Sequence, residues 1–245
     1  MLAFSRVDLA RCLFIAEMPE TTHHSVDRLI RFGEQTPKAF SAANYPAPVD
    51  IRSYTPRLYV CDADRADLDG WLRKQGWSGR RIVLVQAGNH RSMGRRRKRW
   101  ERLQTDDKAW PIERWVCLLQ KIHQRMPDAL IMLRGAQQEV EMLRRIQHVA
   151  SLDCVVVASV GLRRLFALCE ASHSMISVDS GPAHVAAASG LPLVVMYGAG
   201  PQRFWLPRSR GSPVVGVGGP PESRRVDQIS VDSVFEAWCA VLARI

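Results

Sequence analysis

The stretch "MISVDSGPAHVAAASGLPLVVMYGAG", residues 175–200, passes from strand to helix and back to strand. Residues 175–178 are an apolar run of strand formers, residues 182–190 are rich in alanine and end in a glycine, and residues 192–198 are apolar again. Two strands that are joined by a helix pair in parallel, with a right-handed crossover. This stretch therefore predicts a parallel sheet that is covered by helices.

The same alternation continues on both sides of this stretch. Further strands are expected at the apolar runs 82–87, 129–135, 154–159 and 213–218, and further helices at 110–126, 138–150, 162–172 and 231–245. The expected strands are apolar along their whole length, which is typical of parallel strands that are buried on both faces. The sequence therefore predicts an α/β fold with a doubly wound, Rossmann-like parallel sheet.

The first part of the chain does not share this rhythm. Helical segments are expected at 27–35 and 64–75, on either side of a proline-rich stretch, and residues 57–62 are the one segment there that is expected to form a strand. We therefore divide the chain into an incomplete N-terminal region, residues 1–78, and a sheet domain, residues 79–245.

The composition indicates a globular protein with a substantial hydrophobic core. Of the 245 residues 47% are hydrophobic, yet no apolar run reaches the roughly 18–20 residues that a membrane span requires. The start of the chain has acidic residues within its apolar stretch, unlike a secretory signal, so we expect a cytoplasmic protein. The six cysteines are scattered without the spacing of a zinc site, and no metal is expected.

The net charge of +10 is concentrated in one segment. Residues 91–102, "RSMGRRRKRWER", hold seven basic residues against one glutamate, which accounts for +6 of the +10. A nucleic-acid-binding domain would combine such charge with stacking aromatic residues or a recognition helix, and Trp100 is the only aromatic residue here. Nucleic acid is therefore not an expected partner.

The turn between the strand at 175–178 and the following helix is the first candidate binding site. In an open parallel sheet, ligands bind beyond the carboxyl ends of the strands, where free amide groups and the helix dipole favour anions. Gly181 leaves room for a ligand, whereas the carboxylate of Asp179 suits the hydroxyl groups of a sugar better than a phosphate. His184 lies one turn further on. An ordinary helix cap by Asp179 or Ser180 is the structural alternative.

Two further loops leave the same expected edge of the sheet. One contains Gly88 and continues to Lys108, just before the helix that begins near Pro111. The other contains Gly135 and Glu139. Together, the three loops predict a pocket for a ligand that carries phosphate groups.

The segments "VLVQAGN", "DKAWPIERW", "LRGAQQEVEMLRRI" and "SVDSGPAHVAAASGLPLVVMYG" resemble the C-terminal half of glycosyltransferase family 9, the ADP-heptose:lipopolysaccharide heptosyltransferases of Gram-negative bacteria. The resemblance implies a B-type glycosyltransferase fold, whose C-terminal half binds the nucleotide-sugar donor and whose N-terminal half binds the acceptor. It implies that residues 1–78 are a remnant of the acceptor domain and that residues 79–245 are the donor-binding domain. Its most specific part is the D-[ST]-G-x-x-H pattern at 179–184. The donor-binding residues that it implies are Gly88, Lys108, Glu139, Asp179, Ser180, Gly181 and His184.

The resemblance also implies the chemistry. The expected reaction is an inverting transfer of a sugar from a nucleotide-sugar donor to lipopolysaccharide core or a related glycan. The expected donor is ADP-heptose, and no cofactor is expected. The family's N-terminal glycine-rich segment, which contains the presumed catalytic aspartate, has no counterpart here, so the catalytic residue is left unassigned. The alternative is a truncated, inactive paralogue that binds the donor or a partner protein without transfer.

Other functional classes fit the sequence less well. Ser180 lacks the first glycine of a hydrolase nucleophile elbow, and no glycine-rich dinucleotide fingerprint or phosphate-binding loop follows a strand. As a hypothesis, the arginines of the basic segment contact an anionic lipid-linked acceptor at the inner membrane, since basic clusters bind acidic lipid surfaces. A solvated loop is the alternative. These arginines are Arg95, Arg96, Arg97 and Arg99.

Overall fold

The computed structural model of the chain describes residues 2–3, 14–15, 24–33, 55–89, 106–209 and 211–244. They belong to two compact units, Met1–Tyr54 with Arg203–Trp205, and Thr55–Gln202 with Leu206–Ile245. The first unit contains the short parallel strands β1 (Leu2–Ala3) and β2 (Phe14–Ile15) and the helix α1 (Ser25–Gly33). The candidate lipid-contact residues Arg95, Arg96, Arg97 and Arg99 lie outside the described residues.

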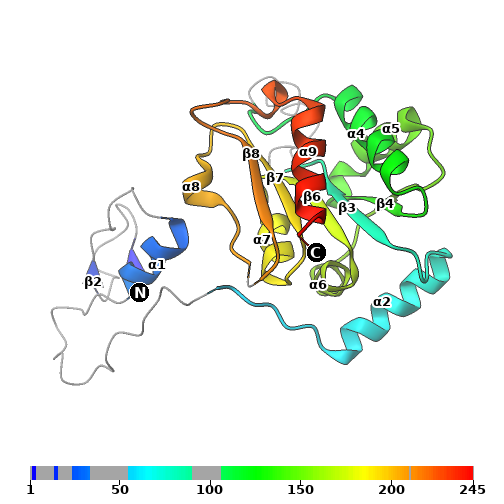
Figure 1. Ribbon diagram of the computed structural model, residues 1–245. Helices are drawn as coiled ribbons and strands as arrows, with labels where there is room; N and C mark the ends of the chain where they lie inside the picture. Colours follow the sequence, from blue (N-terminus) through cyan, green and yellow to red (C-terminus); the bar gives the residue numbers. More distant parts are fainter. Residues whose placement is uncertain are drawn as a thin grey trace. The chain divides into compact units, whose positions relative to one another are not determined.

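The second unit is built on a six-stranded sheet in the order β5-β4-β3-β6-β7-β8, and every pair of neighbours is parallel (Figure 1). The strands are β3 (Ile82–Gln86), β4 (Leu130–Arg134), β5 (Val155–Ala158), β6 (Ser174–Val178), β7 (Leu193–Tyr197) and β8 (Val214–Gly218). The first and last residues of each strand lie within one or two residues of the ends of the predicted apolar run.

Helices cover both faces of this sheet, which confirms the doubly wound α/β fold. On one face lie α4 (Ile112–Arg125), α5 (Val140–Ala150) and α9 (Val231–Leu242), and on the other lie α2 (Asp62–Gln75), α6 (Leu162–Ala171) and α7 (Gly181–Ala188). Successive strand residues point to opposite faces, so Val83 and Val85 belong to one core and Ile82 and Leu84 to the other. Apolar strands are required because neither face meets water.

The prediction of a strand at 57–62 is wrong. Residues 55–60 have no regular structure, and α2 begins at Asp62. The backbone N–H of Leu58 donates to the carbonyl of Ala188 at 3.0 Å, and Val60 is buried beside the core under α6 and α7. The apolar composition of this segment therefore reflects burial rather than strand pairing.

Helix α2 belongs to the same compact unit as the sheet. Its Leu68 and Leu72 are buried in the core that α6 and α7 share, and its Arg65 pairs with Glu170 of α6 at 2.8 Å. This unit therefore begins at Thr55 rather than near residue 79. The helix predicted at 138–150 begins with a 3-10 turn, η4 (Gln137–Glu139), before α5. Two short helices were not expected: α8 (Gln202–Trp205) and η5 (Val226–Gln228).

The strand order places a topological switch point between β3 and β6. From β3 the chain continues through α4 to β4 on one side, whereas β6 continues through α7 to β7 on the other. The loops that follow β3 and β6 therefore leave the sheet edge toward opposite faces. A crevice between such loops is where open parallel sheets bind their ligands.

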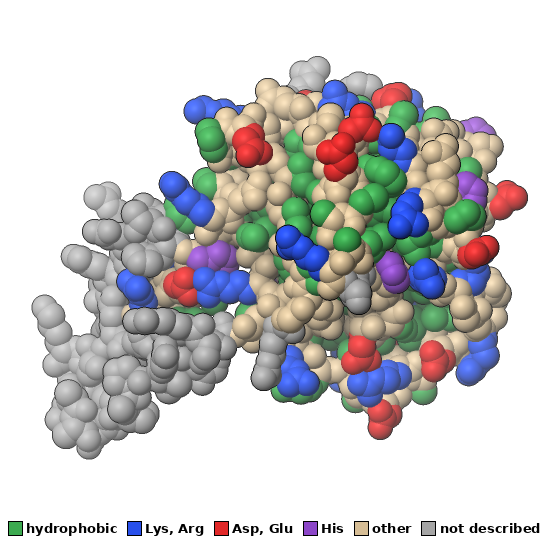
Figure 2. All heavy atoms as spheres, in the orientation of Figure 1, with side chains coloured by type: hydrophobic (Ala, Val, Ile, Leu, Met, Phe, Trp, Pro, Cys, Tyr) green, Lys and Arg blue, Asp and Glu red, His purple; other side chains and the backbone are tan. Residues whose placement is uncertain are grey.

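Charge on the surface is mixed. On the face that Figure 2 draws, Lys and Arg side chains are interspersed with Asp and Glu side chains. Within the described ranges, no helix combines the length and the apolar character needed to cross a membrane.

Candidate functional site

A salt bridge spans the switch point. The Nζ atom of Lys108, from the loop after β3, lies 2.7 Å from Oδ2 of Asp179, the residue that follows β6. Lys108 Nζ also donates to the backbone carbonyl of Asp179 at 3.1 Å. The two side chains are only 16% and 15% exposed, so the pair is shielded from solvent but not sealed from it. The sequence analysis selected both residues, and the structure brings them together.

The first turn of α7 lies directly beside this pair. Ser180 is the N-cap residue with an extended backbone, but its side chain forms no capping bond, and its Oγ lies 3.1 Å from Ser177 Oγ instead. The Asp179 carboxylate pairs with Lys108, so ordinary helix capping does not explain these residues. A Cβ atom on Gly181 would meet nothing within 4 Å. His184 is exposed, one turn further along α7.

The loop segment that carries Lys108 is fixed from three directions. Asp106, which is 2% exposed, accepts from Asn89 Nδ2 and from the backbone N–H of Lys108, both at 3.0 Å. Asp107 accepts the backbone N–H of Ala199, after β7, at 2.7 Å through its Oδ2. Three consecutive residues thus contact the loops after β3, β7 and β6. The position of the lysine is set by its neighbours as well as by Asp179.

A second hydrogen-bonded series holds the loop that contains Gly88. Arg134 Nη1, at the end of β4, donates to Gln86 Oε1 at 2.7 Å, and Gln86 Nε2 donates to the Gly88 carbonyl at 2.8 Å. Burial lowers the pKa of Arg134, while the negative charge of Glu139 acts in the opposite direction. The Arg134 Nε atom is buried and has no partner within the described part of the chain.

The electrostatic influence of Asp179 extends to β7. Tyr197 is fully buried, and burial raises the pKa of its phenol, with a further increase from the negative charge of Asp179. Tyr197 therefore stays protonated and neutral beside the salt bridge. A neutral phenol adds no negative charge that would compete with an anionic ligand for Lys108.

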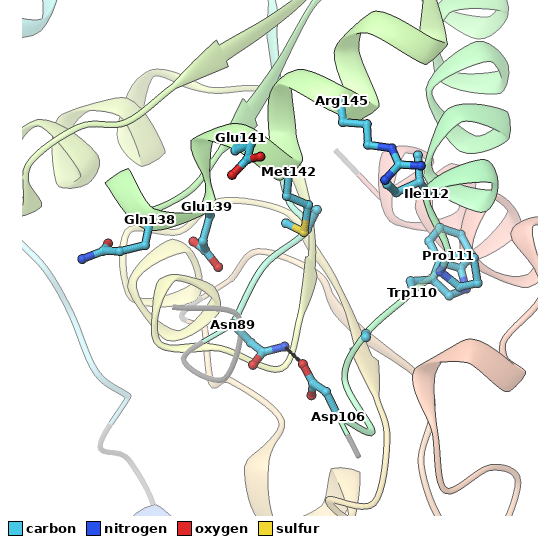
Figure 3. A pocket seen from close by; sticks show the side chains of 12 residues that line it. Asn89, Asp106, Trp110, Pro111, Ile112, Gln138, Glu139, Glu141, Met142 and Arg145 are labelled. Carbon is cyan, nitrogen blue, oxygen red and sulfur yellow. Dashed lines mark hydrogen bonds between the residues drawn. The ribbon is translucent and has the colours of Figure 1, made fainter. Parts of the chain in front are cut away.

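A cavity of about 320 Å³ opens beside this loop at the carboxyl ends of β3 and β4 (Figure 3). It is lined by Ala87, Asn89, Asp106, Ala109, Trp110, Pro111, Ile112, Gln138, Glu139, Glu141, Met142 and Arg145. Figure 3 shows the Glu139 carboxylate on one wall and the side chains of Trp110, Pro111 and Ile112 on the other. The cavity thus combines an apolar wall with carboxylates.

The walls of this cavity are anchored elsewhere in the unit. The Trp110 indole donates to the Ile229 carbonyl at 3.0 Å and packs edge-on against Trp115, with 4.8 Å between ring centroids. Opposite it, Glu139 is 3% exposed, and its Oε2 accepts the backbone N–H of Ala136 at 2.7 Å. Contacts within the protein therefore hold both walls of the cavity in place.

Sequence reasoning missed several residues of this site. Asp106, Asn89, Gln86 and Arg134 were not selected, although a polar Gln86 at the end of an apolar strand and the charged run before Trp110 were visible signals. Glu139 lines the cavity, as does Asn89 next to Gly88. No group of three or more His, Cys, Asp or Glu side chains suited to a metal ion occurs within the described ranges.

The fold is that of one half of a B-type glycosyltransferase. The structure is similar to a family 9 glycosyl transferase from Veillonella parvula, with a TM-score of 0.72 and 18% identity, over 94% of this chain and 63% of that one. It is similar to the ADP-heptose lps heptosyltransferase II of E. coli, with a TM-score of 0.70 and 19% identity, over 94% and 65% of the two chains.

Sequence comparison identifies the family. The model of glycosyltransferase family 9 (heptosyltransferase) matches residues 101–232, and the chain belongs to this family. A curated relative, the lipopolysaccharide core heptosyltransferase OpsX of Haemophilus influenzae, is 28% identical over 92 residues, which are 37% of this chain and 26% of that protein. The chain thus spans about a quarter of this relative and less than two thirds of each solved structure.

Proposed function

We propose that the chain binds a nucleotide-sugar donor at the carboxyl edge of the sheet and transfers its sugar to lipopolysaccharide core or a related glycan. The observation that carries this proposal is the Lys108–Asp179 pair at the switch point. It places a cation beside a carboxylate that can accept hydrogen bonds from sugar hydroxyl groups. Membership of the heptosyltransferase family supports the same reaction class.

The phosphate groups of the donor are assigned to Lys108 and the start of α7. The Lys108 ammonium and the uncapped first turn of α7 both favour negative charge. Gly181 leaves the approach open. When a sugar is transferred, the leaving diphosphate gains charge, so the same groups would stabilise the transition state. Asp179, which would repel phosphate, is assigned to hydroxyl groups of the sugar.

The nucleoside is assigned to the neighbouring cavity. Its carboxylates, Glu139 among them, suit ribose hydroxyl groups and disfavour phosphate, whereas Ile112 and Met142 offer an apolar surface for a base. The two ends of the site therefore differ in electrostatic character, as the two ends of a nucleoside diphosphate do. ADP-heptose is the proposed donor, and a relative of similar fold bears that sugar nucleotide in its name.

The acceptor side is proposed on family grounds. An anionic, lipid-linked glycan at the cytoplasmic side of the inner membrane would be the acceptor, with peripheral contact to the membrane through the arginines of residues 95–99. The group that deprotonates the acceptor hydroxyl is left unassigned, and such a group contributes about 10²–10⁴-fold to the rate. Donor binding does not depend on it.

Calorimetric titration tests the donor site. ADP, UDP, GDP and ADP-heptose are titrated into the unchanged protein, Lys108→Met and Asp179→Asn. Lys108→Met should weaken ADP and ADP-heptose alike, by about tenfold or more, because a charge-assisted bond to phosphate is lost. Asp179→Asn should weaken ADP-heptose more than ADP, because its carboxylate is assigned to the sugar.

A matched control is Lys121→Met, since Lys121 is 40% exposed on α4 and pairs with Asp232. Equal affinities for all four proteins would contradict the donor site. A transfer assay with ADP-heptose and a heptose-deficient core acceptor tests the reaction itself. Intact binding without any transfer would leave the donor site standing and support the inactive alternative.

A further inference from the structure

A second cavity, of about 500 Å³, opens at the amino edge of the same sheet, opposite the candidate donor site. It lies between the segment before β3 and the segment that joins α4 to β4. Its lining residues are Gly79, Arg80, Arg81, Arg125, Met126, Pro127, Asp128 and Ala129. Nothing in the proposed transfer reaction uses this cavity.

Three arginines line it, all at exposed positions, and they are not equivalent. Arg80 is a fixed part of the wall, because its Nη2 donates to the carbonyls of Asp128 at 3.2 Å and Ala129 at 3.3 Å. Neither Arg81 nor Arg125 has a side-chain hydrogen bond or ion pair to any residue that the structure describes. Two guanidinium groups are therefore available to a ligand.

The charge balance of this cavity is positive. Its lining contains three guanidinium groups against the single carboxylate of Asp128. The field extends to neighbouring groups. Burial lowers the pKa of His173 and Arg81 lowers it further, whereas Arg80 opposes the increase that burial causes in the pKa of Cys154. The carbonyl end of α4, at Met126, and the nearby Asp153 act against this field.

We propose that this cavity binds the phosphate group of a second ligand, independently of the donor site. Guanidinium groups bind phosphate with paired, charge-assisted hydrogen bonds, and two of them are unoccupied here. The cavity is larger than inorganic phosphate needs, so the ligand is a phosphate ester, either a soluble phosphorylated sugar or the headgroup of an anionic phospholipid. The proposal stands apart from the donor assignment and does not require it.

Amide signals in NMR spectra of the ¹⁵N-labelled full chain test this site. Inorganic phosphate is titrated at constant ionic strength, with chloride as the reference anion, while the signals of Gly79 and Ala129 are followed. In parallel, sedimentation is measured with phosphatidylcholine vesicles that contain or lack phosphatidylglycerol. We expect Arg81→Ser/Arg125→Ser to weaken the binding by about tenfold or more.

The matched control is Arg73→Ser/Arg144→Ser, which removes the same charge from exposed helix positions outside both cavities. Saturable phosphate shifts that only the Arg81/Arg125 variant loses would support a soluble ligand. Vesicle binding that needs phosphatidylglycerol and these two arginines would support a lipid headgroup.

Equal loss in both double variants, or no binding in either assay, would overturn the proposal. Folding is checked by circular dichroism, and neither substitution removes a described contact. Signals at the donor site, such as those of Gly181 and Ala183, report separately on phosphate bound near Lys108. Failure of one site can therefore be distinguished from failure of the other.

Discussion

Lys108 and Asp179 form a partly shielded ion pair whose groups are also the ones a diphosphate sugar would use. Breaking such a pair by removing one partner leaves the other charge poorly solvated, which is costly at low exposure. In the proposed donor complex, the diphosphate supplies negative charge to Lys108 and the sugar supplies hydroxyl groups to Asp179. On this proposal, each member of the pair exchanges its partner for a group of the donor.

At Gln86 a single side chain connects two parts of the site. Gln86→Met should destabilise the protein by about 1–3 kcal/mol, because Arg134 Nη1 and the Gly88 carbonyl both lose a buried partner. Urea denaturation measures the effect. Gln124→Met, at an exposed position of α4, is the control and should change stability by no more than about 0.5 kcal/mol. Equal stability of the two variants would contradict the role assigned to Gln86.

Individual site residues were predictable where they lie next to an element boundary. Asp179 and Gly181 follow a clear strand and begin a clear helix, so their place at the sheet edge followed from the pattern. Asp106 and Arg134 could not be selected in this way. Their importance comes from partners that lie 17 and 48 residues away in the sequence, which local periodicity does not reveal.

Among the elements, the described end of the loop before α4 and the first turn of α4 are fastened to the segment around η5. Arg114 Nη1 donates to the carbonyls of Asp227 at 2.6 Å and Ile229 at 2.7 Å, and the Asp107 carbonyl accepts the Val226 N–H at 2.7 Å. The segment around η5 thus fastens the loop that carries Lys108. A rigid support of this kind is what a precise binding geometry requires.

Glycine at position 198 is required by the close approach of this loop to the end of β7. A Cβ atom there would collide with the backbone carbonyl and carboxylate of Asp107. Gly198→Ala should therefore lower stability by about 1–3 kcal/mol and weaken ADP binding, since Asp107 and Lys108 must move. Thermal and urea denaturation, with calorimetry, measure both effects.

The control is Gly70→Ala, within α2, where an added Cβ meets nothing within 4 Å. It should raise stability by about 0.5–1 kcal/mol, because alanine loses less backbone entropy than glycine in a helix. A Gly198→Ala protein that matched the unchanged chain in stability and ADP affinity would argue against a close-packed loop.

Prediction of elements succeeded for the sheet and failed at residues 57–62. Buried parallel strands and the helices between them have distinct periods, so their positions could be predicted to within a few residues. Residues 57–62 have the same apolar composition as a strand, but residues 55–60 adopt no regular structure. The apolar composition of a segment indicates that it is buried. Whether it forms a strand depends on a neighbouring strand to pair with, which the local sequence does not specify.

At the scale of the whole molecule, the sheet unit has a proposed ligand site at each of two opposite edges. The carboxyl edge combines Lys108 with an acidic and partly apolar cavity, and the amino edge presents arginines. The domain class was predictable from the alternation of elements. The second cavity was not, because its arginines come from segments 44 residues apart, at Arg81 and Arg125, and carry no motif.

The extent of the folding unit can be tested by shortening the chain. A chain that begins at Thr55 keeps α2, whereas one that begins at Gly79 loses the buried side chains of Leu68 and Leu72 and exposes the apolar surface that they cover. The shorter chain should be less stable by about 3–6 kcal/mol, from two buried leucines. Equal urea midpoints and slopes would show that α2 is not part of this unit, as the boundary at residues 78 and 79 predicts.

A crystal structure of the chain with ADP tests the central claim most directly. We predict that the diphosphate lies within hydrogen-bonding distance of Lys108 Nζ and the first turn of α7, with the ribose facing Glu139 in the cavity beside Met142. The Lys108–Asp179 contact should lengthen as the lysine turns to the phosphate. ADP bound elsewhere, with that salt bridge intact and the cavity empty, would contradict the account.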